Sequence, residues 1–237
     1  MSGKKNPMFR NLLVLLLGFA SLVANAAGLD VYLVRHAETQ ANASGIHNTV
    51  TSGAFSAQGE AQIRALTDGL MHYRFDAILV SPTERTLYSI APYLLQSGRS
   101  AEIWPEIAEC CWQKDRVSNA PGALVWGDDI HLPVTIAPQF VFRTDIPQRN
   151  FANRSYADGV AQVRLAADLI RQRYGHSGKS ILLVLHYHSG AVLMAELLGQ
   201  DREQVPHLKN ARLTHLHQDE QGDFHLVGVN ASPGEAE

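Results

Sequence analysis

The chain has 237 residues, of which 46% are hydrophobic and 18% are charged, so its composition excludes a disordered tail and a fibre. A single α/β domain commonly has roughly 200 to 250 residues, and a chain of that size needs no disulfide or metal ion to stabilise its core. The formal net charge of −3 provides no general attraction to nucleic acids or anionic membranes, and we expect no nucleic-acid partner.

The first segment, residues 1–26, has the layout of a secretory signal peptide. Three basic residues precede an apolar run at 12–23, and an A-x-A cleavage site ends at Ala26. The run has 12 residues, whereas a helix that spans a bilayer needs roughly 20. We expect cleavage after Ala26, which changes the net charge from −3 to −6, and export of residues 27–237 to the periplasm or the medium without stable membrane insertion. An uncleaved membrane anchor and a buried N-terminal helix are the alternatives.

Strand and helix patterns alternate along the rest of the chain. The predicted elements are a strand at 31–34, a helix at 57–73, a strand at 75–80, a helix at 83–96, a short strand at 101–104, a helix at 154–174, a strand at 181–185, a helix at 190–198, and strands at 212–218 and 224–229. This order predicts an α/β fold, a three-layer αβα sandwich with a mostly parallel central sheet and a C-terminal antiparallel hairpin. Neither a repeat nor a linker indicates a second domain.

One long stretch, residues 105–153, lacks a regular hydrophobic period and contains several prolines. We expect an irregular excursion over one end of the sheet, where it shapes a substrate pocket. The stretch includes the only two cysteines, Cys110 and Cys111. Cysteines of exported proteins usually pair, but adjacent residues pair badly, so two partly buried thiols fit better than a vicinal disulfide.

Three polar clusters follow three predicted strands. Arg35-His36 follows the first strand, residues 81–85 follow the strand at 75–80, and residues 186–190 follow the strand at 181–185. In an open α/β sheet, ligands bind at the carboxyl ends of the strands, where helix N-termini also converge. Arginines, histidines and helix N-termini in one crevice suit a compact dianion such as phosphate. A single arginine or histidine at a strand end is usually structural, but the joint placement of three clusters favours a binding site.

Motifs at these positions resemble the histidine phosphatase superfamily, also called the phosphoglycerate mutase-like family, in its first branch. The family pattern R-H-G-E-T-x-x-N corresponds to residues 35–42, with Ala37 in place of glycine. The pattern S/T-x-x-G-x-x-Q corresponds to residues 56–62, and S-P-x-x-R-x-x-x-T corresponds to residues 81–89, with Ser89 in place of threonine. The motifs follow one another in the family order, and the resemblance covers nearly the whole chain after the signal segment.

The resemblance implies a role for each matching residue. His36 is the expected nucleophile, whose imidazole carries the phosphoryl group as a covalent intermediate. Arg35, Arg85 and His188 are expected to hold the nonbridging oxygens, and Asn42 belongs to the same phosphate-binding set. Phosphoryl transfer depends mainly on positioning and charge stabilisation, which fixed cations supply. The resemblance requires no cofactor and no metal ion.

A general acid must protonate the leaving alkoxide, and the family pattern E-x-x-x-G-x-W points to Glu106, six residues before Trp112. Such an acid needs a raised pKa to hold a proton at the working pH. Cys110 stands where the family has glycine, which weakens the alignment. Glu109 is therefore the alternative acid. The pair of a protonated glutamate and a deprotonated His36 predicts an acidic to neutral pH optimum.

The second catalytic histidine is expected to be His188, because the helix that follows then keeps the family register, and His186 is the alternative. These two histidines alternate on an extended segment, so they point to opposite faces and form a poor metal site. No role is expected for the remaining histidines, such as His47.

The sequence thus predicts an exported, metal-independent phosphatase that hydrolyses small phosphomonoesters through a phosphohistidine. A phosphoglycerate mutase-type transfer is one alternative, although the family's N-E-R-H-Y-G segment is absent. A non-catalytic phosphate-binding or regulatory module is the other. Neither the identity of the substrate nor the oligomeric state can be inferred from the sequence.

Overall fold

The computed structural model describes residues 28–112, 127–151 and 155–234, so the proposed signal peptide lies outside the described residues. One sheet has its strands in the order β4-β3-β2-β5-β1-β6-β7. The strands are β1 (Leu29–Arg35), β2 (Ala77–Val80), β3 (Ala101–Ile103), β4 (Phe140–Phe142), β5 (Ser180–Leu185), β6 (Leu213–Gln218) and β7 (Phe224–Ala231). Strands β1 to β5 pair in parallel, whereas β6 is antiparallel to both β1 and β7. The predicted mostly parallel sheet with a C-terminal hairpin is confirmed.

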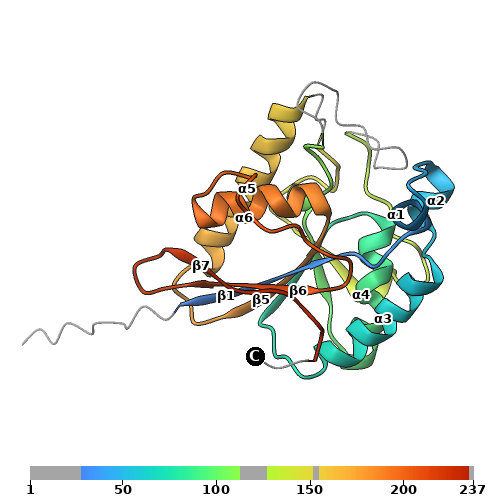
Figure 1. Cartoon of the computed structure of the whole chain (residues 1–237), viewed down its shortest axis with the longest axis horizontal. Coiled ribbons are helices and arrows are strands. Elements are labelled where there is room, and N and C mark those ends of the chain that lie inside the picture. Colours follow the sequence, from blue (N-terminus) through green and yellow to red (C-terminus); the bar gives the residue numbers. More distant parts are fainter. Residues whose placement is uncertain (1–27, 113–126, 152–154, 235–237) are drawn as a thin grey trace, which may run out of the picture.

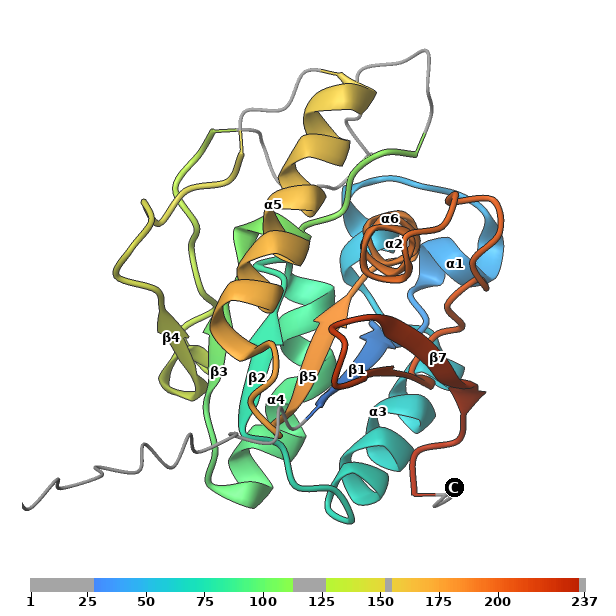
Figure 2. The same ribbon diagram turned by 90° about the vertical axis from the view of Figure 1, so that its left-hand side faces the viewer.

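Helices cover both faces of this sheet. The helices are α1 (Gln40–Ser44), α2 (Thr49–Gly53), α3 (Ala57–Leu70), α4 (Glu84–Ser97), α5 (Tyr156–Tyr174) and α6 (Tyr187–Leu198), with 3-10 turns η1 (Pro105–Ile107) and η2 (Ala137–Gln139). Figures 1 and 2 show α5 and α6 on one face and α3 and α4 on the other. None of the helices in the described ranges is both long enough and apolar enough to cross a bilayer.

The apolar strand β5 explains how the two faces are filled. Its side chains alternate: Ile181 and Leu183 belong to the core under α5 and α6, while Leu182 and Val184 belong to the core under α3 and α4. All four are fully buried. A central strand that is apolar on both faces is typical of a parallel sheet between two helical layers, and the three-layer sandwich is confirmed.

The structure adds elements that the hydrophobic pattern did not predict. Short helices α1 and α2 are each fixed by a capping box, in which Thr39 and Asn48 serve as N-caps. The stretch at 105–153 was expected to be irregular, but it contains β4, which pairs with β3 at the edge of the sheet. Helix α6 begins at Tyr187, three residues before the predicted start, with His186 as its N-cap.

The parallel register brings three strand ends together. Arg35 at the end of β1 lies opposite Leu185 of β5, and Val80 at the end of β2 lies opposite Val184. Figure 2 shows β2, β5 and β1 side by side. The backbone N–H of His36 continues this pairing by donating to the Leu185 carbonyl (3.0 Å). The three polar clusters that follow these strands therefore meet at one edge of the sheet.

Candidate active site

A cavity of about 610 Å³ lies at this edge of the sheet. Its walls include five of the predicted site residues: Arg35, His36, Asn42, Arg85 and His188. The other lining residues are Glu38, Thr39, Ala41, Gly45, His47, Ser52, Glu109, Trp112, Tyr187 and Asn210. The structure therefore brings the two arginines, His36 and His188 to one cavity, as the strand-end clusters predicted.

His36 is a buried, neutral imidazole. Its Nδ1 lies 2.8 Å from the carbonyl oxygen of Ala37, and because a carbonyl can only accept, Nδ1 carries the proton. Nε2 then holds a free lone pair. Burial, together with the positive charges of Arg85 and Arg35, holds the pKa of His36 well below its ordinary value of 6.5. A neutral ring with an unprotonated Nε2 is the form that can attack phosphorus.

The backbone after His36 tolerates alanine in place of the family's glycine. The described non-glycine residues with a positive φ are Cys111, His176, Ala211 and Asn230, so Ala37 has an ordinary negative φ. The Ala37 N–H donates to Ser89 Oγ (2.9 Å), and this hydroxyl donates in turn to the Arg85 carbonyl (2.6 Å). Ser89, which stands where the family has threonine, thus connects the loop after His36 to α4 through these hydrogen bonds.

Residues of the motif at 56–62 contact Glu38, which lines the cavity, and hold it in place. Ser56 Oγ donates to Glu38 Oε1 (2.6 Å), and the Glu38 N–H donates to Gln62 Oε1 (2.8 Å). A Cβ at Gly59 would lie 2.0 Å from the Glu38 carbonyl oxygen, so only glycine fits there. Serine, glycine and glutamine are therefore needed at this spacing because each contacts the same residue.

Asn210 is a site residue that the sequence analysis missed. Its Nδ2 donates to the His36 carbonyl (2.7 Å) and lies 3.4 Å from Asn42 Oδ1. The Asn42 side chain also accepts from the Thr39 N–H as part of the α1 capping box. Asn210 lies just before β6, outside every motif, and its only sequence signal is that an amide precedes a predicted strand.

Two guanidinium groups lie close to His36. Arg85 is 9% exposed and donates through Nε to His186 Nδ1 (3.2 Å). Arg35 lies over the Tyr187 ring at 5.0 Å and donates to the Leu208 carbonyl (3.3 Å). Burial lowers the pKa of both guanidinium groups from the ordinary value, yet arginine stays protonated at any working pH. Two partly or fully buried cations beside a neutral histidine favour an anionic ligand.

The two candidate second histidines occupy different places. His186 is fully buried and does not line the cavity; its ring lies 5.4 Å from the His36 ring. Because Arg85 donates to Nδ1, the proton of a neutral His186 lies on Nε2, which donates to Ser81 Oγ (2.7 Å). Both nitrogens of His186 are thus occupied within the protein. His188 lines the cavity and is the histidine available to a ligand.

The two candidate acids are also separated. Glu109 lines the cavity, and its Oε1 accepts from the backbone N–H groups of Cys110 (3.2 Å), His188 (3.2 Å) and Ser189 (3.0 Å). It is therefore attached to the N-terminus of α6. Glu106 is fully buried and does not line the cavity. The structure does not bring Glu106, the acid favoured by the motif spacing, to the other site residues.

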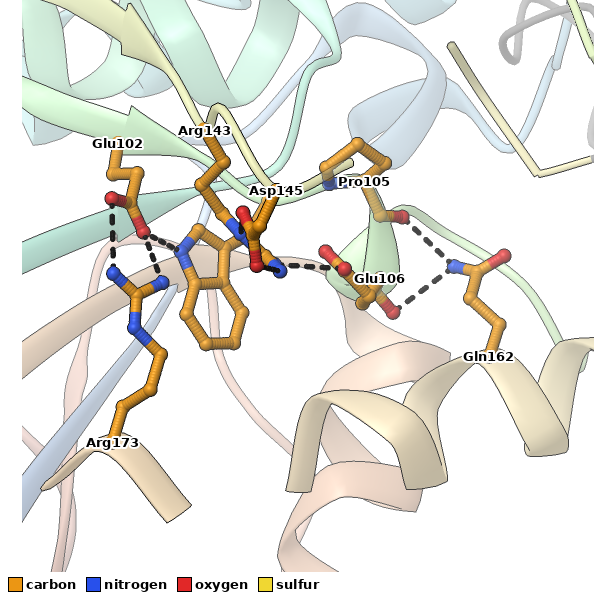
Figure 3. Close-up of polar contacts among 8 residues, drawn as sticks. Glu102, Pro105, Glu106, Arg143, Asp145, Gln162 and Arg173 are labelled. Carbon is orange, nitrogen blue, oxygen red and sulfur yellow. Dashed lines mark hydrogen bonds and ion pairs between the residues drawn. The ribbon is translucent and has the colours of Figure 1, made fainter. Parts of the chain in front are cut away.

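Glu106 instead belongs to a structural cluster, shown in Figure 3. Its Oε1 pairs with Arg143 Nη1 (2.8 Å), and Arg143 also pairs with Asp145 (2.6 Å) and lies over the Trp104 ring. Burial raises the pKa of Glu106 from 4.5, although Arg143 opposes the shift. Gln162 of α5 donates to the carbonyls of Pro105 and Glu106, as well as to that of Ala108. The cluster holds the backbone that leads to Glu109.

The preference for two separate thiols was wrong, because Cys110 and Cys111 form a disulfide. Both residues are buried beneath α5. Cys111 has a φ of 63°, a left-handed conformation that lets adjacent side chains turn toward each other. A Cβ at Gly159 would lie 2.8 Å from Cys111 Sγ, so the glycine makes room for the sulfurs. Neither the positive φ of Cys111 nor the space beside Gly159 could be inferred from the presence of two adjacent cysteines in the sequence.

Aromatic side chains form another part of the cavity wall. Trp112 lies 6.4 Å from His47 and 6.3 Å from His188, measured between ring centroids. Tyr187 stacks on His207 at 5.1 Å. His47, for which no role was expected, is thus a lining residue. Within the described ranges, no three histidine, cysteine, aspartate or glutamate side chains are grouped as a metal site would require.

The fold and the cavity together define a class: an α/β protein that holds a neutral histidine close to two arginines at the carboxyl edge of a parallel sheet. Residues 31–120 match the model of the histidine phosphatase superfamily (branch 1). The resemblance inferred from the motifs is thereby confirmed for this part of the chain. Among proteins with curated functional descriptions, none matches the chain.

Solved structures share the fold at low sequence identity. A putative α-ribazole-5′-phosphate phosphatase from Escherichia coli is 22% identical, with a TM-score of 0.59 over 88% of this chain and 99% of that one. A mycobacterial glucosyl-3-phosphoglycerate phosphatase is 19% identical, with a TM-score of 0.60 over 86% and 99%. A phosphoserine phosphatase from Entamoeba histolytica is 17% identical, with a TM-score of 0.56 over 88% and 100%. These likenesses establish the shared architecture.

Proposed function

We propose that the protein is an exported phosphatase that hydrolyses small phosphomonoesters through a phosphohistidine at His36, without a metal ion. One observation carries the proposal: His36 is neutral, its Nε2 is unprotonated, and it lies close to the positive charges of Arg35 and Arg85. Such a site can attack phosphorus and stabilise the added charge with fixed donors.

The first step transfers the phosphoryl group to the protein. The Nε2 lone pair of His36 forms a bond to phosphorus while the bond from phosphorus to the ester oxygen breaks. Arg35, Arg85 and the ring N–H of His188 hold the nonbridging oxygens. The leaving alkoxide takes a proton from Glu109, which lines the same cavity.

The second step reverses the proton transfer. A water molecule gives a proton to the Glu109 carboxylate and attacks phosphorus, and the bond from phosphorus to Nε2 breaks. Inorganic phosphate leaves, and His36 regains its lone pair while Glu109 regains its proton. We assign both proton transfers to Glu109 because Glu106 is buried in its pair with Arg143.

The comparisons support phosphatase chemistry without naming a substrate. The three phosphatases described above share one architecture but are named for different substrates: a ribazole phosphate, a glucosyl phosphoglycerate and phosphoserine. A class of leaving group for this chain therefore does not follow from the fold.

Export is supported by the signal-peptide pattern alone. Cell fractionation followed by intact mass measurement tests it, because a mature protein outside the cytoplasm should begin at Ala27. Full-length protein that stays in the cytoplasm contradicts export but leaves the proposed chemistry in place.

Turnover of a chromogenic aryl phosphate tests the proposed chemistry. The assay uses purified protein with a chelator present throughout. We expect the wild type to release phosphate and His36→Ala to lose the activity by at least about 10³-fold, since the nucleophile is gone. Binding without turnover would indicate a phosphate-binding module. Transfer of phosphate between two positions of one substrate would indicate a mutase.

A further inference from the structure

Arg202 lies in the loop after α6, outside every motif of the family, yet it joins three segments at the cavity. Its Nη1 donates to the carbonyl of Cys111 (2.5 Å) and to the hydroxyl of Tyr156 (3.0 Å). Its Nη2 lies 2.6 Å from Nδ1 of His188. One guanidinium group thus connects the loop after Glu109, the start of α5 and the start of α6.

The contact with His188 determines where that imidazole carries its proton. A guanidinium group has only N–H donors, so His188 Nδ1 must accept from Arg202. A neutral imidazole with an accepting Nδ1 carries its single proton on Nε2. No hydrogen bond from His188 Nε2 to another residue is present within the described part of the chain, and the side chain lines the cavity. The Nε2–H group is therefore available to a ligand.

We propose that Arg202 is a positioning residue for phosphate recognition, which fixes His188 as a neutral imidazole with its Nε2–H available to a nonbridging oxygen. The inference rests on the proposed function. It goes beyond it by assigning a residue from outside the motifs and by specifying which nitrogen of His188 contacts the phosphate.

The surrounding charges agree with a neutral His188. A second proton would lie on Nδ1 and point at the Arg202 guanidinium, which opposes protonation. The pKa of His188 is lowered from 6.5, chiefly by burial; Arg202, Arg35 and His207 lower it further, while Glu109 raises it. Burial, the largest of these effects, acts with the positive neighbours and together they outweigh the Glu109 carboxylate.

The position of the proton can be measured without any turnover. The full chain is labelled with ¹⁵N-histidine, and long-range ¹H–¹⁵N spectra distinguish protonated from unprotonated ring nitrogens. His188→Asn identifies the resonances of this residue by their loss. In the wild type we expect a protonated Nε2 and an unprotonated Nδ1 for His188. A protonated Nδ1 would overturn the proposal, whatever any Arg202 variant does.

Arg202→Met supplies the second measurement, because methionine replaces the aliphatic part of the side chain and removes all hydrogen-bond donors. We expect mixed tautomers of His188, a His188 pKa closer to 6.5, and a kcat/KM for the aryl phosphate lowered up to about 100-fold by the misplaced donor. Arg202→Lys, which retains one donor, should restore the Nε2–H tautomer in part. Unchanged tautomer populations and an unchanged His188 pKa in Arg202→Met would overturn the proposal.

A matched control is available on α5. Arg164 is largely exposed and pairs with Glu196, so Arg164→Met removes an arginine without touching His188. We expect wild-type tautomers and activity. If the wild type shows the expected tautomer and responds to Arg202→Met but releases no phosphate from the ester, then the proposed function fails while the effect of Arg202 on His188 stands.

Discussion

His36 and His188 use their two ring nitrogens in opposite ways. Nδ1–H of His36 donates to the Ala37 carbonyl, so the lone pair of the neutral ring lies on Nε2. The Arg202 guanidinium donates to Nδ1 of His188 and leaves a proton on Nε2. One imidazole is thereby prepared as a nucleophile and the other as a donor, although both are the same residue type and both line the same cavity.

The lowered pKa of His36 has a consequence for activity. Because the pKa lies well below 6.5, the ring is already neutral at pH 6.5 and needs no deprotonation as the pH rises to 7. We expect kcat/KM to stay high from neutral pH down past 6.5 and to fall only in more acidic solution. A profile that rises steadily into the alkaline range would contradict a neutral His36 paired with a protonated glutamate.

The free energy of unfolding should also depend on pH through the protonation of buried histidines. His36 and His186 both have pKa values well below 6.5 in the folded protein, whereas the unfolded chain protonates near 6.5. The unfolded state therefore binds more protons as the pH falls below 6.5, and the free energy of unfolding decreases by up to about 1.4 kcal/mol per pH unit for each histidine. Urea unfolding at several pH values measures this slope. His36→Asn should reduce it, and an unchanged slope would contradict a buried neutral His36.

The choice between the two glutamates is a prediction at the same scale. Glu109→Gln removes the proposed proton donor from the cavity, and we expect kcat for an alkyl phosphate to fall by about 10²- to 10⁴-fold. An aryl phosphate has a better leaving group and should be affected less. Glu106→Gln should instead lower stability, because it removes one of the two carboxylates that pair with the buried Arg143. Loss of kcat in a stable Glu106→Gln, with an active Glu109→Gln, would reverse the assignment.

At the scale of elements, the position of the segment between β1 and α3 is fixed by the close approach of α3 to the backbone of Glu38. Gly59 allows this approach, while Ser56 and Gln62 fasten it with hydrogen bonds. The helix therefore contributes to the cavity without presenting a side chain to a substrate. The motif residues of α3 and its N-cap hold the loop that follows His36 in place.

Gly59→Ala tests this dependence. The added Cβ would lie 2.0 Å from the Glu38 carbonyl oxygen, so the helix or the loop must move. We expect a loss of about 1–3 kcal/mol in the free energy of unfolding, together with a lower kcat/KM. Gly53→Ala is the control, because the nearest neighbour of the added Cβ would be Glu84 Oε2, 3.9 Å away. Equal stability of the two variants in urea unfolding would show that the close approach is unimportant.

For the whole molecule, the sheet was predictable because its central strands are apolar and because three of them are followed by a polar cluster. Residues 31–34 and 181–185 show this pattern most clearly, and their parallel pairing brings Arg35 and His36 beside the start of α6. Helices α1 and α2 were missed because capping boxes, rather than an apolar period, hold five-residue helices in place.

The proposed acid, Glu109, and the residue that contacts His188, Arg202, were harder to predict, because their roles depend on contacts between distant segments. Sequence spacing predicts Glu106 as the acid, whereas we propose Glu109, because Glu106 lies in the η1 turn, pairs with Arg143 and does not line the cavity. Arg143 lies 37 positions further along the chain, and no local pattern signals the pair. Arg202 and Asn210 likewise act through contacts between distant segments.

The central claim is that His36 itself becomes phosphorylated. Rapid quenching of the wild type with a ³²P-labelled phosphomonoester at alkaline pH, followed by digestion and mass spectrometry, measures this directly, because phosphohistidine is stable to base and labile to acid. We expect acid-labile label on the peptide that contains His36, at Nε2, and none in His36→Ala. Substrate turnover by the wild type with no label at His36, or label on another residue, would contradict the account.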